Sequence, residues 1–212
     1  MDPARLSFLL DRWTRLLTAL RCPTGTVASA FADLHEHYTA QERHYHTLDH
    51  IHAVLETVRE LSVAEETPAL LLAAWFHDVV YDSKARDNEE QSAAHARRLL
   101  QPLGVPEPVL AETERLILLT KTHTPTPEDR PGAILVDADL AILGAAETEY
   151  DAYARAIRRE YAWVSDDDYR GGRRAVLERF LQRPRIYATE EMLARAEEAA
   201  RENMQREIAA LR

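Results

Sequence analysis

A histidine and an aspartate directly follow the most apolar segment of the chain. Residues 69–76 (ALLLAAWF) carry no charge, and His77 and Asp78 come next. An ionised carboxylate in apolar surroundings costs free energy unless it is paired with a charge or bound to a cation. Because consecutive helical residues point about 100° apart, two adjacent ligands have to bracket an ion that lies beside the helix. The pair therefore predicts a metal site whose other ligands come from other segments.

Two further segments supply candidates for those ligands. The segment HYHTLDHIH contains four histidines, of which His46 and His50 share one helix face because they are four positions apart. The segment ILVDADLAILG places Asp137 and Asp139 within an apolar run. Taken alone, a histidine at a helix end is more often hydrogen-bonded in a core than a ligand, and one aspartate of such a pair often caps a helix. The three segments together favour a metal centre.

The elements that position these residues are all predicted to be helices. Apolar residues recur three or four positions apart along most of the chain, and no segment alternates as a strand does. Six glycines against ten prolines also leave few glycine turns for an all-β fold. We expect one all-α globular domain over residues 1–212, with a core of about residues 26–187 and a last helix over 189–211. The expected helices, about nine or ten in number, cover residues 4–20, 26–38, 46–61, 68–80, 87–104, 108–119, 133–144, 147–164, 168–182 and 189–211.

Charge and composition narrow the classes of partner. The net charge of −10, from 36 acidic and 26 basic residues, disfavours nucleic-acid polymers and anionic membranes, which need a basic face. The single cysteine, Cys22, permits no internal disulfide and fits a reducing compartment. The longest apolar run is far shorter than a membrane span, and no signal-peptide core precedes it. These features predict a soluble cytoplasmic protein, whose Glu- and Arg-rich last helix is either solvated or part of a homodimer contact.

Taken in order, the motifs resemble those of the HD-domain metal-dependent phosphohydrolases. That superfamily has its ligands in the order His, then His-Asp, then Asp, on helices of an all-α fold. The resemblance extends over residues 43–187, about two-thirds of the chain, and is greatest to a predicted bacterial branch. It is carried by the segments RHYHTLDHI, AAWFHDVVYD, DNEEQSA, DADLAILG, IRREY and GRRAVLERFL.

The resemblance implies a divalent metal ion and its ligands. By position in the motifs, Asp139 is preferred to Asp137 and His50 to His46. Asp137 is then a helix cap or an acceptor that orients a histidine ring. Two imidazoles with two carboxylates suit Mn, Fe, Co, Ni or Zn and tolerate Mg. The implied ligands are His50, His77, Asp78 and Asp139.

The resemblance also implies hydrolysis of a phosphoester or phosphoanhydride bond in a small phosphorylated metabolite, foremost a nucleotide. The chain departs from alarmone hydrolases of the superfamily, which carry a Glu-Asp pair shortly after the His-Asp motif, because Tyr81 stands where that Glu falls. Asp82 remains, and with Glu89 it is a candidate for proton transfer. Glu90 has a simpler explanation as part of a helix cap.

Recognition of phosphate requires local positive charge in this acidic chain. Arginine matches phosphate oxygens in a bidentate manner, although an arginine among acids on a helix is usually a solvated ion pair. The candidates for substrate binding lie in or beside the segments that resemble the family: Arg43, His46, Lys121, His123 and Arg158.

Two other interpretations remain open. The missing glutamate is compatible with a metal- or nucleotide-binding sensor that keeps the fold without turnover. The histidine-rich segment is also compatible with an ordinary core that binds no metal.

Overall fold

All regular structure is helical in the residues that the computed structural model describes, 2–62 and 66–211. This confirms the prediction of an all-α fold of about nine or ten helices. No helix within these ranges is long and apolar enough to cross a membrane. In chain order the helices are α1 (Pro3–Ala19), α2 (Thr24–Tyr38), α3 (Leu48–Ser62), α4 (Pro68–Phe76), α5 (Asn88–Leu100), η1 (Gln101–Leu103), α6 (Glu107–Leu119), α7 (Arg130–Leu140), η2 (Ala141–Gly144), α8 (Glu147–Glu160), α9 (Asp166–Leu181) and α10 (Glu190–Ala210).

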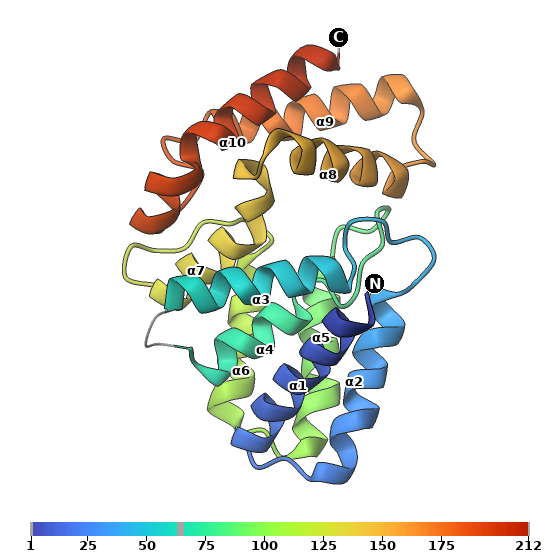
Figure 1. Cartoon of the computed structure of the whole chain (residues 1–212), viewed down its shortest axis with the longest axis vertical. Helices are drawn as coiled ribbons and strands as arrows, with labels where there is room; N and C mark the ends of the chain where they lie inside the picture. Colours follow the sequence, from blue (N-terminus) through green and yellow to red (C-terminus); the bar gives the residue numbers. More distant parts are fainter. Residues whose placement is uncertain (1, 63–65, 212) are drawn as a thin grey trace.

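The helices form two groups, which the short helix η2 connects (Figure 1). In the larger group, α1–α7, helix α4 packs against α3, α6 and α7, and α5 packs against α6. Helices α8, α9 and α10 lie together at the other end of the molecule, and α10 packs against both α9 and η2. Residues from the two groups therefore meet at the boundary between them.

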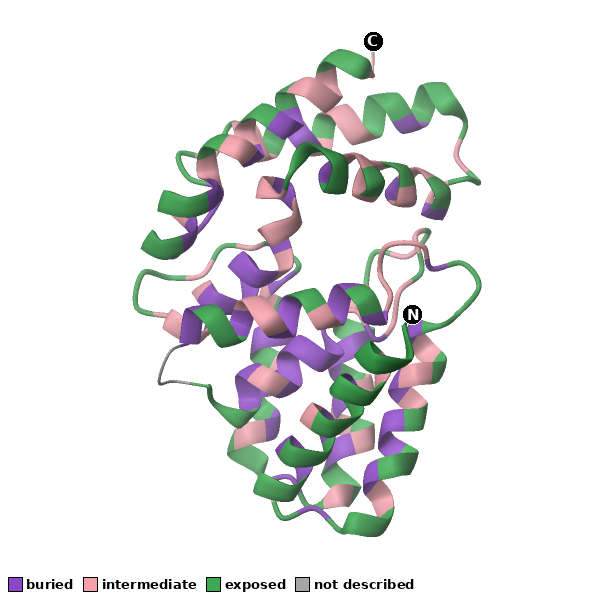
Figure 2. Ribbon diagram, viewed as in Figure 1, coloured by how far each residue is buried: buried purple, intermediate pink, exposed green. Residues whose placement is uncertain are grey.

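Helix α4 is the apolar centre of the larger group. The hydroxyl of Thr67 accepts a hydrogen bond of 3.2 Å from the main-chain N–H of Leu70, and Pro68 occupies the first turn, so the helix begins where the sequence predicts. Every residue of α4 except Pro68 and Leu71 is buried, and Figure 2 shows this continuous burial in the middle of the molecule. A helix that is apolar nearly all round is thus contacted on nearly all sides.

Aromatic side chains hold α1 and α2 against the C-terminal half of α4. The rings of Trp13 and Trp75 meet edge to face with centroids 5.5 Å apart, and Phe31 meets Trp75 in the same way at 6.2 Å. The hydroxyl of Tyr38 donates a hydrogen bond of 2.8 Å to the carbonyl oxygen of Trp75. Each edge-to-face pair contributes about 1 kcal/mol beyond its buried area. The backbone just before His77 is therefore rigidly packed.

The chain leaves the helical conformation at Phe76, whereas the sequence predicted a helix over residues 68–80. The reason is that the carbonyl oxygen of Trp75, which would accept from Val79 in a continued helix, accepts from the Tyr38 hydroxyl. The N–H of Val79 bonds instead to the carbonyl oxygen of Phe76, three positions back, at 3.1 Å. The guanidinium of Arg43 holds the turn that follows, with hydrogen bonds to the carbonyl oxygens of Asp78 (2.6 Å) and Val79 (2.7 Å).

Gly144 lies at the closest approach between η2 and α10. A Cβ atom at this position would lie 2.7 Å from both the Cβ and the carbonyl oxygen of Ala196, and 2.9 Å from the hydroxyl oxygen of Tyr187. The backbone atom cannot rotate away. Gly104, the other predicted helix stop, follows η1 with φ of 83°, a left-handed conformation that glycine adopts without strain.

We predict that Gly144→Ala destabilises the protein by about 1–3 kcal/mol, because the added methyl group overpacks the contact between η2 and α10. Gly171→Ala is the matched control, since a Cβ atom there meets nothing within 4 Å and α9 gains helix propensity. Urea unfolding of both variants measures the effect. Equal stability of the two variants would contradict the packing argument.

Candidate metal centre

Four side chains from three parts of the chain converge beside the end of α4. His50 comes from α3, His77 caps α4, Asp78 follows it, and Asp139 lies in the last turn of α7. One potential ligand atom from each of these residues lies within 4.8 Å of all the others, so together they could hold a metal ion. These are the four residues that the sequence motifs brought together as ligands.

The distances between the ligand atoms are those of a coordination shell. His77 Nε2 lies 3.1 Å from His50 Nε2, 3.2 Å from an oxygen of Asp78 and 3.5 Å from one of Asp139. His50 Nε2 lies 3.5 Å and 3.3 Å from the same two oxygens. Ligands about 2.1 Å from a metal lie about 3.0 Å apart in an octahedron and about 3.4 Å apart in a tetrahedron. A divalent ion therefore fits among these atoms with small side-chain movements.

The hydrogen bond on the far side of the His77 ring supports the same interpretation. Nδ1 of His77 lies 3.1 Å from the carbonyl oxygen of Ala74, which can only accept, so Nδ1 carries the proton. In the neutral ring this leaves the lone pair on Nε2, which faces the other three residues. Metal-binding histidines commonly have this second hydrogen bond to a main-chain carbonyl.

The electrostatics of the cluster favour a cation. Burial by itself raises the pKa of a carboxyl group, but the attraction of His77 outweighs it, and the pKa values of Asp78 and Asp139 lie well below their usual range. Burial lowers the pKa of His77, yet the two carboxylates raise it well above its ordinary value. The carboxylates thus bind protons on the facing imidazoles, and a divalent ion could take the place of those protons.

Asp137, two positions before Asp139 on α7, has a structural role. It is fully buried, and its carboxylate accepts hydrogen bonds of 2.7 Å from the main-chain N–H groups of Ala188 and Thr189 and one of 2.6 Å from the Thr189 hydroxyl. Thr189 is the N-cap of α10. Of the two roles considered for Asp137, this is closer to a cap than to an acceptor for a histidine ring, and it ties α7 to α10.

His123 contacts the second oxygen of a candidate ligand. Its Nε2 lies 2.8 Å from Asp139 Oδ2, while the other oxygen of Asp139 faces the two histidines. The backbone of His123 has a positive φ of 51°, which is uncommon for a residue other than glycine. Arg183 holds this conformation with hydrogen bonds to the carbonyl oxygens of His123 (3.1 Å) and Thr122 (2.9 Å).

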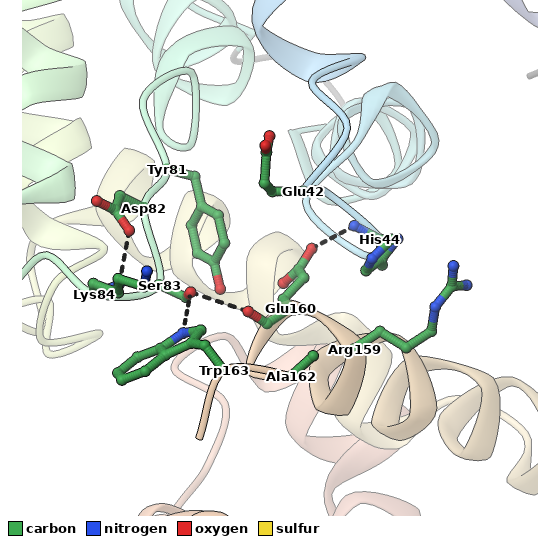
Figure 3. A pocket seen from close by; sticks show the side chains of 10 residues that line it. All are labelled: Glu42, His44, Tyr81, Asp82, Ser83, Lys84, Arg159, Glu160, Ala162 and Trp163. Carbon is green, nitrogen blue, oxygen red and sulfur yellow. Dashed lines mark hydrogen bonds between the residues drawn. The ribbon is translucent and has the colours of Figure 1, made fainter. Parts of the chain in front are cut away.

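Glu160 is a site residue that the sequence analysis missed. Its buried carboxylate accepts hydrogen bonds from the main-chain N–H groups of His44 (2.8 Å), Tyr45 (2.7 Å) and His46 (3.0 Å). Its second oxygen lies 2.7 Å from His46 Nδ1. Figure 3 shows Glu160 reaching from the end of α8 toward His44, beside Tyr81. The segment IRREY contains this glutamate, but no spacing in the sequence pairs it with the histidines.

His46 lies before α3, although the sequence predicted a helix from this residue onward. Its ring stacks on Tyr81 with centroids 4.0 Å apart. The hydrogen bond to Glu160 orients the ring so that Nε2 lies 3.9 Å from Asp78 Oδ2, beyond bonding distance but next to the cluster. Tyr81 therefore supports the ring of His46.

Two hollows flank Tyr81 and Trp163. A cleft of about 700 Å³ is lined by His46, His123 and Glu89 among others, and lies between the two groups of helices. A second hollow of about 560 Å³, drawn in Figure 3, is lined by Asp82 and Glu160 among others. Three of the predicted catalytic and substrate-binding residues thus line the cleft, and two of them, His46 and His123, lie next to the candidate metal ligands.

The remaining predicted residues bond to groups of the protein itself. Arg43 is buried and donates to main-chain carbonyls, as described above. Lys121 bonds to the carboxylate of Glu90 and to the carbonyl of Arg86. Arg158 donates to main-chain carbonyls after α8 and to the carboxylate of Asp166. The side chain of Asp82 accepts from the N–H of Lys84.

We expect His123→Ala to weaken metal binding about 10- to 100-fold, because Asp139 loses the partner that orients it. His123→Gln, whose amide can still donate to that carboxylate, should recover most of the affinity. Titration with Mn²⁺ followed by calorimetry measures both variants. His123 would have no part in the metal centre if His123→Ala left the affinity unchanged. The same would follow if His123→Gln lost as much affinity as His123→Ala.

Glu160 should stabilise the fold in a pH-dependent way. Burial raises the pKa of its carboxyl group, but the hydrogen bonds from His46 and the main chain prevail and lower it to about 2. Its contribution to the free energy of unfolding is therefore complete at neutral pH. The contribution declines as the pH falls from about 4.5, the pKa of this carboxyl group in the unfolded chain, through 2. We predict that Glu160→Gln costs about 3 kcal/mol at pH 7.

Glu160→Gln should lower the free energy of unfolding much less at pH 3 than at pH 7. Glu198→Gln, on the exposed face of α10, is the control for loss of a negative charge. Urea unfolding at the two pH values provides the comparison. A difference between Glu160→Gln and the parent protein that does not change with pH would show that the carboxylate charge is not what matters.

Neither a family model, nor a curated protein, nor a solved structure matches the chain significantly. The resemblance to the HD-domain phosphohydrolases therefore depends on the sequence motifs and stays a prediction.

Proposed function

We propose that this protein is a metal-dependent hydrolase of phosphoester or phosphoanhydride bonds in a small phosphorylated metabolite, foremost a nucleotide. The observation that carries the proposal is the convergence of His50, His77, Asp78 and Asp139 at coordination distances. Their order along an all-α chain is that of the HD-domain phosphohydrolases, which the sequence resembles.

The donor set suits this chemistry. Two imidazole nitrogens and two carboxylate oxygens match a divalent ion such as Mn, Fe, Co, Ni or Zn. Four protein ligands leave two positions for small molecules on an ion that accepts six. A bound divalent ion would supply a Lewis acid for a phosphate oxygen and would lower the pKa of a water molecule. The four side chains would hold the ion next to His46 and His123, which line the cleft.

The cleft offers groups for a small phosphorylated molecule. Its volume of about 700 Å³ lies within the usual range for ligand pockets. His46 and His123, at the metal end, can hold or transfer protons to an oxygen. Tyr169 also lines the cleft, and among the described residues its buried hydroxyl is without a hydrogen-bond partner. An unsatisfied buried hydroxyl is costly, so a polar ligand atom would relieve it.

A second candidate function is a sensor that binds metal and nucleotide without turnover. The observation in its favour is Tyr81, which stacks on His46 at the position where related enzymes carry a glutamate. The two functions differ in one measurement, because only the hydrolase releases inorganic phosphate from the molecules that it binds.

The proposal predicts that the purified protein releases phosphate from at least one member of a panel of phosphorylated metabolites when a divalent metal is supplied. His77→Ala should lower the rate more than about 100-fold, since several kcal/mol of charge stabilisation depend on the metal. His52→Ala is the matched control, because His52 lies on α3 close to His50 but contacts Phe8 instead of the cluster. Phosphate release and metal content are measured for all three proteins.

Binding of a nucleotide with no phosphate release under any metal would favour the sensor. Full activity of a folded His77→Ala protein would reject the proposed site.

A further inference from the structure

A second group of potential metal ligands lies away from the first, between α2 and α5. Asp33 and His37 are four positions apart on α2, so they share one face of that helix. His95 comes from α5. One ligand atom from each of the three residues lies within 4.8 Å of the other two. No residue of this group belongs to the candidate centre at the end of α4.

Short contacts join the three side chains. His95 Nε2 lies 2.6 Å from Asp33 Oδ2, and His37 Nδ1 lies 3.6 Å from the same oxygen. The two imidazole rings meet edge to face with centroids 4.5 Å apart. Ligands about 2.0 Å from a tetrahedral metal lie about 3.3 Å apart, so the contact between His95 Nε2 and Asp33 Oδ2 must open by well under 1 Å. Side-chain torsions suffice for this change.

We propose that Asp33, His37 and His95 form a binding site for Zn²⁺. Two nitrogen ligands and one carboxylate oxygen are a common zinc set, and open zinc sites have three protein ligands with water in the fourth position. The side chains of Asp33 and His37 are 29% and 33% exposed, whereas that of His95 is 12% exposed. The site is thus anchored on α5 and accessible to water from the α2 side.

The proton positions of the two histidines differ. His37 Nδ1 donates a hydrogen bond of 2.8 Å to the main-chain carbonyl of Asp33, which leaves the lone pair of the neutral ring on Nε2. A metal-binding histidine typically has this hydrogen bond. His95 has Nε2 against the carboxylate and accepts a hydrogen bond of 3.2 Å at Nδ1 from the guanidinium of Arg98.

Arg98 therefore opposes the proposed site. A metal on His95 Nε2 moves the ring proton to Nδ1, where it would face the guanidinium N–H. Arg98 must then turn away, and it can, because it is exposed at the surface of α5. Its positive charge also repels a cation. Removing the guanidinium should accordingly tighten the site, an effect that a simple hydrogen-bonded Asp33–His95 pair does not predict.

The test counts and identifies the bound ions. With Zn²⁺ alone as probe, equilibrium dialysis of the full chain should give two ions per chain. One ion should be lost in His95→Gln and the other in His77→Ala, with circular dichroism to confirm folding. Co²⁺ adds a spectroscopic signature, because four-coordinate Co²⁺ absorbs visible light much more strongly than six-coordinate Co²⁺. That absorption should vanish in His95→Gln and persist in His77→Ala.

The affinity of the variants completes the test. Arg98→Ala should bind the second ion about tenfold more tightly, while Asp33→Asn should bind it at least about tenfold more weakly. A single ion that is lost only in His77→Ala would overturn the proposal, and so would an affinity that stays the same or falls in Arg98→Ala. These outcomes are independent of phosphohydrolase activity, so the failure of either proposal can be recognised separately.

Discussion

The rest of the structure depends on the placement of two carboxylates beside the most apolar helix. Asp78 and Asp139 face His50 and His77, whose side chains are almost completely buried, with 2% and 1% exposure. Charges in such a position are tolerated only with a cationic partner, because the surrounding protein cannot solvate them as water does. Both imidazoles point a nitrogen at the carboxylates. The cluster is therefore balanced by protons or by a metal ion, and the packing around it serves to keep the four groups at the same distances.

Two buried charges of opposite sign hold the backbone around that cluster. Arg43 donates to the carbonyl oxygens of Asp78 and Val79, at the point where α4 ends. Glu160 accepts from three consecutive N–H groups of the segment that precedes α3. Each charge is offset by main-chain dipoles, which are fixed in place and do not titrate. These hydrogen bonds fix the non-helical backbone next to His77 and His46.

A metal site could be predicted from the sequence because an acid that follows an apolar helix, such as Asp78, has no local explanation. The choice of His50 and Asp139 as ligands came from the resemblance to a family. The structure brings these residues together, and metal binding stays a prediction. Glu160 left no such trace in the sequence, since its partners lie more than a hundred positions earlier in the chain, and all but the His46 ring are main-chain groups, which every sequence has. The end of α4 was misplaced for the same reason, because helix periodicity does not register the hydrogen bonds that the distant Tyr38 and Arg43 make to the main chain there. The residue types of Lys121 and Arg158 likewise did not reveal that each bonds to groups of its own surroundings.

The C-terminal helices are part of the site, although none of them carries one of its four candidate ligands. Glu160 at the end of α8 orients His46, and Asp137 fastens α7, which carries Asp139, to the start of α10. Arg183, just after α9, holds the strained backbone of His123. Within this group Arg173 and Glu207 pair with only 8% and 11% exposure, so α9 and α10 act as one unit. The hydrogen bonds of Glu160, Asp137 and Arg183, by contrast, cross from one group of helices to the other. The packing of α8–α10 therefore bears on the cleft through His46 and on the orientation of Asp139 through His123.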